Sequence, residues 1–376
     1  MNMHPINFVN SDSILSLSGV CAVILVLAWF NGANDVSKGI ATLVGGGNTA
    51  PRRAVLWGSF WTVLGGLAAM IWGVALIDTF SRGLLAPGFS ADLIYLASAV
   101  LGATGWIILA TRLGLPVSTT HALLGGIIGA ALAVVGPSGL RASAIASKAM
   151  LPLLVSPLVA IVLCWMLLLL GKMIARRVPA WRPGCCSQDE WRKNPFICDP
   201  SRPVMPEEPK RSRIERLLSL LHWLSSGATS FARGLNDTPK IAAFLFLGLS
   251  LFPGAITVTL PINLPIVAVA LAMGLGSLWG GYRVLSVMAH RIAPLDQRNA
   301  LVANVTTSSL VLLASPLGLP MSTTHISTGA LFGVRLGERQ TPRENDAIKM
   351  ILFGWLVTLP VAAVLAVAGN WLLRVL

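Results

Sequence analysis

Long apolar stretches without any charged side chain constrain the fold of this chain most strongly. The stretches 54–77 and 149–171 contain no charge, and each reaches the roughly 20 residues that an α-helix needs to cross a bilayer. Of the 376 residues, 11% are charged, whereas an ordinary soluble domain has about 25%. A membrane β-barrel would show alternating strands of about 10 residues instead. The sequence therefore predicts an all-α integral membrane protein and excludes a soluble globule.

The net charge of +13 is carried mainly by the segments that connect the apolar stretches. Because the cytoplasmic loops of membrane proteins collect Lys and Arg, we interpret this charge as a topology signal and expect no nucleic-acid partner. The longest connecting segment, 176–216, is rich in Pro, Arg and Lys and predicts a cytoplasmic linker that is partly disordered. It separates a first membrane repeat, 1–175, from a second membrane repeat, 217–376.

Two short motifs occur once in each half of the chain. The sequence N-D-V-S-K at 34–38 is matched 202 residues later by N-D-T-P-K at 236–240. The sequence G-L-P-V-S-T-T-H at 114–121 is matched 204 residues later by G-L-P-M-S-T-T-H at 318–325. Over 17 positions that begin with this second motif, nine residues are identical in the two halves. The chain therefore contains an internal duplication.

Each half contains about five apolar segments, which predicts about ten transmembrane segments in all. Because an odd number of crossings ends on the opposite side of the membrane, the second half has the inverted orientation, as in the inverted repeats of many secondary transporters. The distribution of Lys and Arg places the linker in the cytoplasm and both termini outside. The fourth segment of each half is short for a span, so that it either crosses the membrane or re-enters it. The segments are 14–44, 54–77, 91–112, 118–135, 151–174, 218–252, 263–285, 299–316, 321–335 and 350–373.

Charged side chains within the predicted spans gather at the two copies of the first motif. Asp35 and Lys38 lie in the first copy, Asp237 and Lys240 lie in the second, and Arg233 precedes the second copy by about one turn. An ionised group at mid-membrane is costly, so such groups face a cavity, a partner or an ion. We therefore treat these five side chains as functional.

Asn34 and Asn236 directly precede the two carboxylates. Because Asn, Asp and Gly favour turns over helix interiors, we expect both helices to break there and to free backbone carbonyls at mid-depth. Together with the oxygens of Asn34, Asp35, Asn236 and Asp237, these carbonyls suit a small hard cation. The alternative interpretation is an Asp–Lys ion pair, three residues apart on one helix, that only neutralises itself.

The second motif predicts two helices that begin inside the protein. Pro116 and Pro320 end the preceding helices, and the next Ser of each motif is a natural N-cap. A helix N-terminus presents free N–H groups and a partial positive charge, so two such ends can bind a tetrahedral oxyanion between them. The alternative is that the hydroxyls only cap a kinked helix and pack a small-residue interface. The predicted substrate-binding residues are Ser118, Thr119, Thr120, Ser322, Thr323 and Thr324.

His121 and His325 follow these hydroxyls directly. A histidine in this place can relay protons, or it can orient the loop by hydrogen bonding, and both alternatives stay open. We expect no cofactor and no metal site other than one for a coupling sodium ion.

In these motifs the chain resembles the inorganic phosphate transporters of the PiT, or Pho-4, type. Members of that family have a G-A-N-D signature and a G-x-P-x-S-x-T-H signature in each half, with a variable cytoplasmic loop between the halves. The resemblance covers both halves outside the linker. It implies phosphate transport with sodium ions or protons. It also implies that the Asn and Asp residues of the first motif lie near the coupling cation and the Ser and Thr residues of the second lie near the anion.

Three positions depart from the family pattern. Lys38 stands where Asn is common, Arg233 where His is common, and Pro239 where Gln is common. We interpret Lys38, Arg233 and Lys240 as residues that tune the charge of the site. Our hypothesis is that the Lys38 ammonium replaces a sodium ion, which favours proton coupling or another cation stoichiometry.

Phosphate at neutral pH can donate hydrogen bonds to Asp35 or Asp237, whereas sulfate can only accept them. A site with carboxylates beside its donors should therefore prefer phosphate. Together with the resemblance, this predicts a secondary active transporter that imports phosphate by symport with protons or sodium ions through alternating access, and a sulfate or related oxyanion permease of the same fold is the alternative. An intramembrane enzyme would use the two carboxylates as acid and base, but no nucleophile is singled out by spacing. A channel would not need two broken helices around one site. We expect the protein to lie in the cell membrane, which in bacteria is the inner membrane. A homodimer is one alternative for its oligomeric state.

Overall fold

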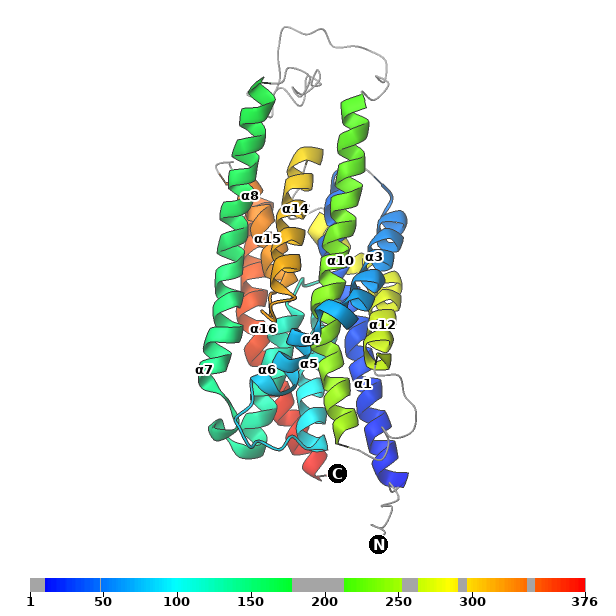
Figure 1. Cartoon of the computed structure of the whole chain (residues 1–376), viewed down its shortest axis with the longest axis vertical. Coiled ribbons are helices and arrows are strands. Elements are labelled where there is room, and N and C mark those ends of the chain that lie inside the picture. Colours follow the sequence, from blue (N-terminus) through cyan, green and yellow to red (C-terminus); the bar gives the residue numbers. More distant parts are fainter. Residues whose placement is uncertain are drawn as a thin grey trace.

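The computed structural model of the protein describes residues 11–47, 49–177, 213–251, 263–289, 296–336 and 342–375. Within these ranges the regular secondary structure is helical, apart from one isolated antiparallel bridge between Leu85 and Leu140. Most of the helices lie roughly along the long axis of the molecule (Figure 1). The predicted all-α fold is therefore confirmed.

The first half contains eight α-helices and the second half contains six within the described residues. Five helical segments are long and apolar enough to cross a membrane, again counted in the part of the chain that the structure describes. The predicted linker is described only at its two ends, where α8 and α10 extend into it, and residues 178–212 lie outside the described residues. The helices of the first half are α1 (Ser11–Asp35), α2 (Ser37–Gly45), α3 (Pro51–Trp72), α4 (Val74–Asp78), α5 (Leu93–Leu113), α6 (Thr119–Val135), α7 (Ala142–Ala144) and α8 (Leu151–Arg177), and those of the second half are α10 (Arg213–Ser250), α12 (Leu264–Gly280), α13 (Tyr282–Val287), α14 (Gln297–Ala314), α15 (Thr323–Val334) and α16 (Pro342–Val375).

The helices α5 and α6 form a hairpin that enters and leaves at the end of the bundle where α1 begins and α16 finishes (Figure 1). Just past the end of α6, the Gly139 carbonyl accepts a 3.0 Å hydrogen bond from the Ala86 N–H. Just before α5, the Phe89 ring packs against Tyr95 with 5.1 Å between ring centroids. These contacts hold the outer ends of both helices at the same level.

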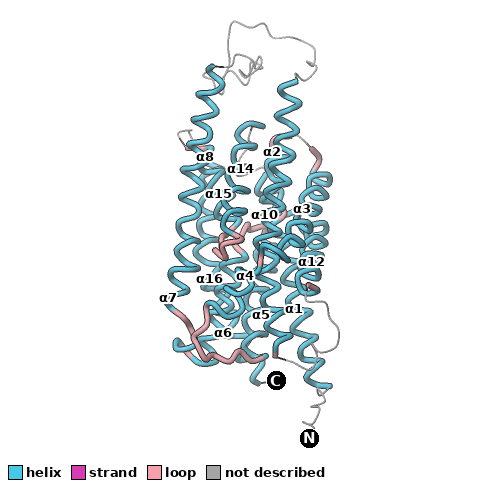
Figure 2. The backbone as a smooth tube through the Cα atoms, viewed as in Figure 1, coloured by secondary structure: helices cyan, strands magenta, loops and turns pink. Residues whose placement is uncertain are grey.

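The helices α14 and α15 form a corresponding hairpin at the opposite end of the bundle, and the loops at the tips of both hairpins lie at mid-height (Figure 2). The segments 118–135 and 321–335 therefore re-enter the bundle and do not cross it. Two of the five predicted segments in each half thus form a hairpin, as the alternative of re-entrant segments allowed, and this leaves three predicted crossings in each half. Three crossings are still an odd number, so the argument for an inverted second half is unchanged.

The first helices of the two halves run in opposite directions, because α1 starts at the chain-end side and α10 starts at the linker side (Figure 1). The helix α1 packs closely against α12, and α10 packs closely against α3. A Cβ atom at Gly32 would lie 2.0 Å from the Met273 carbonyl oxygen, and one at Gly234 would lie 2.1 Å from the Thr62 carbonyl oxygen. Gly32 and Gly234 are 202 residues apart, which is the spacing of the first motif. This correspondence supports an inverted relation between the halves.

The predicted helix breaks differ between the two copies of the first motif. In the first copy α1 ends at Asp35 and α2 begins at Ser37. Val36 between them keeps helical backbone angles (φ −56°, ψ −34°), and its N–H bonds the Gly32 carbonyl at 3.1 Å, so the interruption is limited to one residue. In the second copy α10 continues through the motif with Pro239 inside it, and the expected break is wrong. Proline removes one hydrogen bond of the helix, but neighbouring groups can compensate within a helix bundle. Here Lys240, the next residue of α10, bonds the tip of the α14–α15 hairpin and holds this part of the helix in place.

Candidate functional site

The tips of the two hairpins have the same local structure. The Ser118 side chain accepts a hydrogen bond of 3.2 Å from the His121 N–H, and the Ser322 side chain accepts one of 3.2 Å from the His325 N–H. The backbone angles of the two caps are also similar, with φ −90° and ψ 112° at Ser118 and φ −94° and ψ 111° at Ser322. The predicted N-caps are confirmed, and α6 and α15 begin inside the protein.

The two tips are tied to each other by a reciprocal pair of hydrogen bonds. The Thr120 hydroxyl donates to the Met321 carbonyl at 3.1 Å, and the Thr324 hydroxyl donates to the Val117 carbonyl at 2.8 Å. Each bond joins a residue of the first half to the equivalent region of the second. We call this pair of bonds the hairpin clasp. It brings the positive ends of α6 and α15 together at the centre of the bundle, where the first N–H groups of each helix have no partner within the helix.

Both lysines of the first motif form the ion pair with the carboxylate three residues earlier. Lys38 contacts Asp35 and also donates to the Val117 carbonyl at 3.2 Å. Lys240 lies 3.2 Å from an Asp237 oxygen, and it donates to the Met321 carbonyl at 2.8 Å. The ion pair that stood as the alternative interpretation is therefore present in both copies. It does more than neutralise itself, because each ammonium also bonds the carbonyl at one hairpin tip.

Asn34 and Asn236 connect the motif helices to the hairpins. The Asn34 side chain donates to the Leu115 carbonyl at 2.9 Å and accepts a hydrogen bond of 3.3 Å from the Val117 N–H. The Asn236 side chain donates to the Met321 carbonyl at 3.1 Å and accepts one of 3.3 Å from the Ser315 hydroxyl. These amides hold the loops in place in the present arrangement, so their oxygens are already used.

Arg233 and Asn31 occupy equivalent places in the two copies, 202 residues apart. Arg233 donates through Nη2 to Thr62 and to Ser277, the second at 3.3 Å. Asn31 donates to the Thr119 hydroxyl at 2.7 Å. The sequence reasoning did not include Asn31 among the site residues, although aligning the two halves would have placed it opposite Arg233. No signal in the sequence pointed to Thr62 or Ser277.

The two histidines lie side by side, with 4.5 Å between their ring centroids. The ring Nδ1 of His121 is 2.9 Å from the Ser118 hydroxyl oxygen, and the ring Nδ1 of His325 is 3.2 Å from the Leu153 carbonyl oxygen on α8. The His325 ring also stacks on Trp355 at 3.9 Å. These contacts fit the expectation that the histidines orient the loops, and a proton relay stays a prediction.

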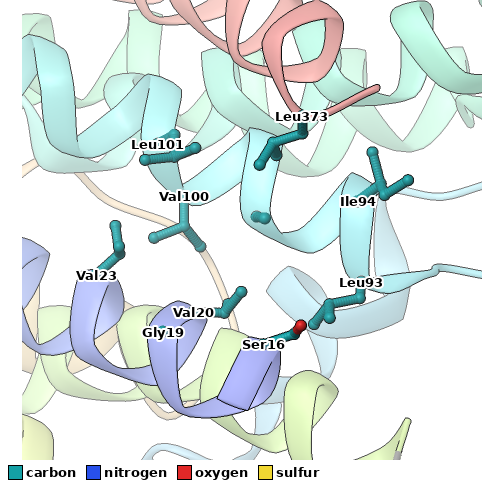
Figure 3. Close-up of a pocket in the computed structure, with 10 residues that line it drawn as sticks. Ser16, Gly19, Val20, Val23, Leu93, Ile94, Val100, Leu101 and Leu373 are labelled. Carbon is teal, nitrogen blue, oxygen red and sulfur yellow. The ribbon is translucent and has the colours of Figure 1, made fainter. Parts of the chain in front are cut away.

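Every predicted site residue is at most 5% exposed, so these side chains are closed off from solvent in this structure. An apolar pocket of about 430 Å³ lies elsewhere, between α1, α5 and α16, with Val20, Val100 and Leu373 in its lining (Figure 3). Such a lining cannot replace the water around an anion, and it contains none of the motif residues. The described residues contain no group of three His, Cys, Asp or Glu side chains that could hold a metal ion.

A family model described as the phosphate transporter family matches residues 31–366. The match includes both copies of both motifs. The chain belongs to the phosphate transporter family. It is therefore a multi-pass membrane protein that takes part in phosphate transport, and it is a transport protein and not an enzyme.

Individual relatives support the same assignment. A protein named as a probable low-affinity inorganic phosphate transporter of Rhizobium meliloti is 28% identical over 358 residues, which cover 93% of this chain and 94% of the relative. A protein of the same name from Mycobacterium leprae is 28% identical over 364 residues, which cover 95% of this chain and 78% of the relative. A solved structure titled the sodium-dependent phosphate transporter aligns with a TM-score of 0.78 and 23% identity, over 96% of this chain and 100% of that chain. That likeness shows that the two proteins share a fold.

Proposed function

We propose that this chain imports inorganic phosphate by proton-coupled symport through alternating access. The observation that carries the proposal is the meeting of the N-termini of α6 and α15, which the hairpin clasp holds together. Free N–H groups and hydroxyls at two helix ends form a site for an oxyanion without a permanent covalent or metal ligand. Binding of this kind is weak enough to be reversed, which a carrier needs.

The substrate ligands in this proposal come from both hairpins. Each helix end offers the N–H groups of its first two residues, together with their hydroxyls. Thr120 and Thr324 are engaged in the clasp, so these hydroxyls become available when the tips separate. The proposed substrate-binding residues remain Ser118, Thr119, Thr120, Ser322, Thr323 and Thr324.

The surroundings of the two lysines favour protons over sodium ions as the coupling cation. A carboxylate oxygen and a backbone carbonyl oxygen are ligands that suit a small hard cation. Around Asp35 these ligands contact the Lys38 ammonium, and around Asp237 they contact the Lys240 ammonium. A sodium ion would have to displace a charged side chain at either place. Sodium dependence is a property named for the structural relative, and sodium coupling is the alternative for this chain.

Alternating access needs two halves that can move relative to each other around a shared site. The opposite directions of α1 and α10 and the opposite entry of the two hairpins support a pair of inverted halves (Figure 1). In the proposed orientation the linker lies in the cytoplasm and both chain ends lie outside, because the connecting segments at the linker end carry most of the Lys and Arg.

Uptake of labelled phosphate into proteoliposomes tests the proposal. We expect saturable uptake that an inward proton gradient drives, that persists without sodium, and that excess sulfate does not inhibit. Strict sodium dependence at fixed pH would reject proton coupling. Strong competition by sulfate would favour the oxyanion permease, and conductance without saturation would indicate a channel.

A further inference from the structure

The apolar pocket between α1, α5 and α16 lies toward the end of the bundle where α1 begins and α16 finishes (Figure 1). Of the residues that line it, Val20 and Val100 are buried, whereas Ser16 and Gly19 are exposed. Figure 3 shows these side chains around the pocket, with Leu373 on the side opposite α1. The pocket therefore opens to the surface of the bundle, close to one face of the membrane.

The duplication of the chain shows that this space is not a necessary result of the fold. Val20 and Val100 correspond to His222 and Asn304 at the spacings of the two motifs, 202 and 204 residues. The His222 Nε2 and the Asn304 Nδ2 each lie 3.1 Å from the Thr42 hydroxyl oxygen, and all three side chains are buried. At this place the second half joins helices through hydrogen bonds, whereas the first half has short apolar side chains that leave a pocket.

A membrane lipid is the partner that suits a pocket of this kind. Water does not fill an apolar cavity, because the lining offers too few hydrogen bonds. An empty cavity also loses the dispersion contacts of the atoms around it. Gly19 shows that room is left, since a Cβ atom there would meet nothing within 4 Å. A hydrocarbon chain from the surrounding bilayer would supply the missing contacts.

Two opposite charges flank the pocket. Leu93 and Leu373 line it, and their neighbours in sequence are Asp92 and Arg374, which are both exposed. Among the described residues, neither of these charges takes part in an ion pair. The Arg374 Nε donates to the Asn370 side chain at 3.0 Å, so that the two terminal nitrogens of the guanidinium are available to a ligand.

The two charges lie at the same level of the bundle. The helices α5 and α16 are antiparallel, since α5 begins at the end where α16 finishes (Figure 1). The Asn370 side chain donates to the Ser98 hydroxyl at 3.3 Å, and Arg374 lies one turn beyond Asn370. Arg374 is therefore beside the first turn of α5, whose N-cap is Asp92. A positive and a negative group next to an apolar pocket match the headgroup and the chain of a zwitterionic phospholipid.

We propose that the pocket binds one acyl chain of a phosphatidylethanolamine molecule, whose phosphate contacts Arg374 and whose ammonium contacts Asp92. The ammonium of this lipid has three N–H donors, as that of lysine has, and a guanidinium suits the oxygens of a phosphate. Phosphatidylcholine has no N–H donor in its headgroup, and phosphatidylglycerol brings no positive charge to Asp92. The site is separate from the motifs and does not rest on the proposed function.

Thermal unfolding of the delipidated protein in a mild detergent tests the binding. A ligand that binds only the folded state raises the melting temperature. Added phosphatidylethanolamine should therefore raise it more than equal amounts of phosphatidylcholine or phosphatidylglycerol. Native mass spectrometry should find one phosphatidylethanolamine molecule retained per chain. Equal shifts for the three lipids, or no retained lipid, would overturn the proposal.

Filling the pocket tests the seat of the acyl chain. Gly19→Leu adds a side chain where a Cβ meets open space, and leucine favours a helix more than glycine does, so the variant should fold. Its affinity for phosphatidylethanolamine should fall about tenfold or more, because the acyl chain loses buried contacts. Gly171→Leu on α8 is the matched control, because a Cβ there also meets nothing within 4 Å but lies outside the pocket. Ala97→Leu fills the same pocket from α5 and decides the matter if Gly19→Leu does not fold.

Asp92→Asn tests the headgroup without removing the helix cap, because asparagine is as good an N-cap as aspartate. This variant should bind phosphatidylethanolamine about two- to fivefold more weakly, as expected for an exposed charge pair. It should also no longer distinguish this lipid from phosphatidylcholine. Arg374→Gln should weaken the binding of both lipids by a similar factor, because both carry the phosphate. An unchanged preference in Asp92→Asn, or unchanged affinities in Arg374→Gln, would overturn the assignment of the headgroup.

A second copy of this chain is another apolar occupant, and the same variants separate it from a lipid. If Gly19→Leu changes the oligomeric mass and leaves the retained lipid unchanged, the pocket is an interface between copies and the proposal is wrong. If Gly19→Leu and Gly171→Leu bind phosphatidylethanolamine with equal affinity, the pocket does not hold the acyl chain, and the proposal is also wrong.

Discussion

The Lys240 ammonium donates a hydrogen bond of 2.7 Å to the Thr120 hydroxyl. Lys240 belongs to the second half of the chain and Thr120 to the first, so a charge from one half supports the hairpin tip of the other. Lys38, the equivalent residue of the first half, bonds the Val117 carbonyl of its own half. The two copies of the motif are therefore related in sequence but not identical in what they connect.

Replacement of Lys240 by Met should abolish uptake and destabilise the protein. The change leaves the buried Asp237 carboxylate without its ion-pair partner, which costs about 3–5 kcal/mol. The double variant Lys240→Met with Asp237→Asn removes both charges and should recover most of the stability, but not the transport. Thermal unfolding in detergent measures the difference, and equal melting temperatures for the single and double variants would contradict the prediction.

The variant Asp35→Asn should abolish or uncouple uptake and leave the protein folded. Asn has nearly the same shape, so hydrogen bonding with Asn31 and Thr119 can persist, whereas Lys38 loses its counter-charge. Uptake driven by a proton gradient, compared with counterflow at equal pH, separates loss of coupling from loss of binding. Gel filtration confirms the folded state. Coupled uptake at the wild-type rate would contradict the assignment of this carboxylate.

Ser118→Ala and Thr119→Ala should weaken phosphate binding in different ways. Ser118 is an N-cap, and its loss should lower stability by about 1 kcal/mol as well as loosen the helix end. The Thr119 change should act mainly on KM, by about 3 kcal/mol at most if one hydrogen bond to the anion is lost. Ser138→Ala is the control, because this exposed hydroxyl bonds the Val135 carbonyl outside the site. If both variants match the control in KM, the helix ends do not bind the anion.

Lys38→Asn should make uptake depend on sodium. The change removes the ammonium from the Asp35 carboxylate and the Val117 carbonyl and leaves oxygens that suit a sodium ion. Uptake should be measured with sodium varied at fixed pH and with choline as the replacement cation. An active variant that remains independent of sodium would show that these oxygens do not form a cation site.

Gly234→Ala should destabilise the protein and reduce transport. The added methyl group would meet the Thr62 backbone at 2.1 Å, so α3 and α10 would have to separate, at a cost of about 1–3 kcal/mol. Gly19→Ala on α1 is the matched control, because nothing lies within 4 Å of a Cβ there. Melting temperatures of the two variants measure the effect, and equal values would contradict the close packing of the helices.

Much of the fold could be predicted because it depends on local patterns that the duplication repeats. The caps at Ser118 and Ser322 follow from residue type and from the preceding proline, and both are formed as expected. Whether the following helix crosses or re-enters could not be predicted, because length alone did not decide between the two. The continuity of α10 through Pro239 was also missed, since the sequence does not show which neighbouring groups compensate for the hydrogen bond that proline removes.

The candidate site was predicted less completely than the fold. Formal charge inside apolar segments identified Asp35, Asp237 and their lysines, since such groups are rare in spans. The pairing of each ammonium with a hairpin carbonyl required the packing of distant segments. The same is true of Arg233, whose partners Thr62 and Ser277 lie in helices that carry no motif.

The reciprocal form of the hairpin clasp has a consequence for the order of events in transport. Each of its two bonds joins the first half to the second, so the two tips separate only when both bonds are broken. In the proposed alternating-access cycle, exposure of the site to one face of the membrane and exposure to the opposite face would therefore begin with the same rupture, of two bonds worth about 0.5–1.5 kcal/mol each. Loading and unloading would then share this first barrier, and a substitution that lowers it should speed both.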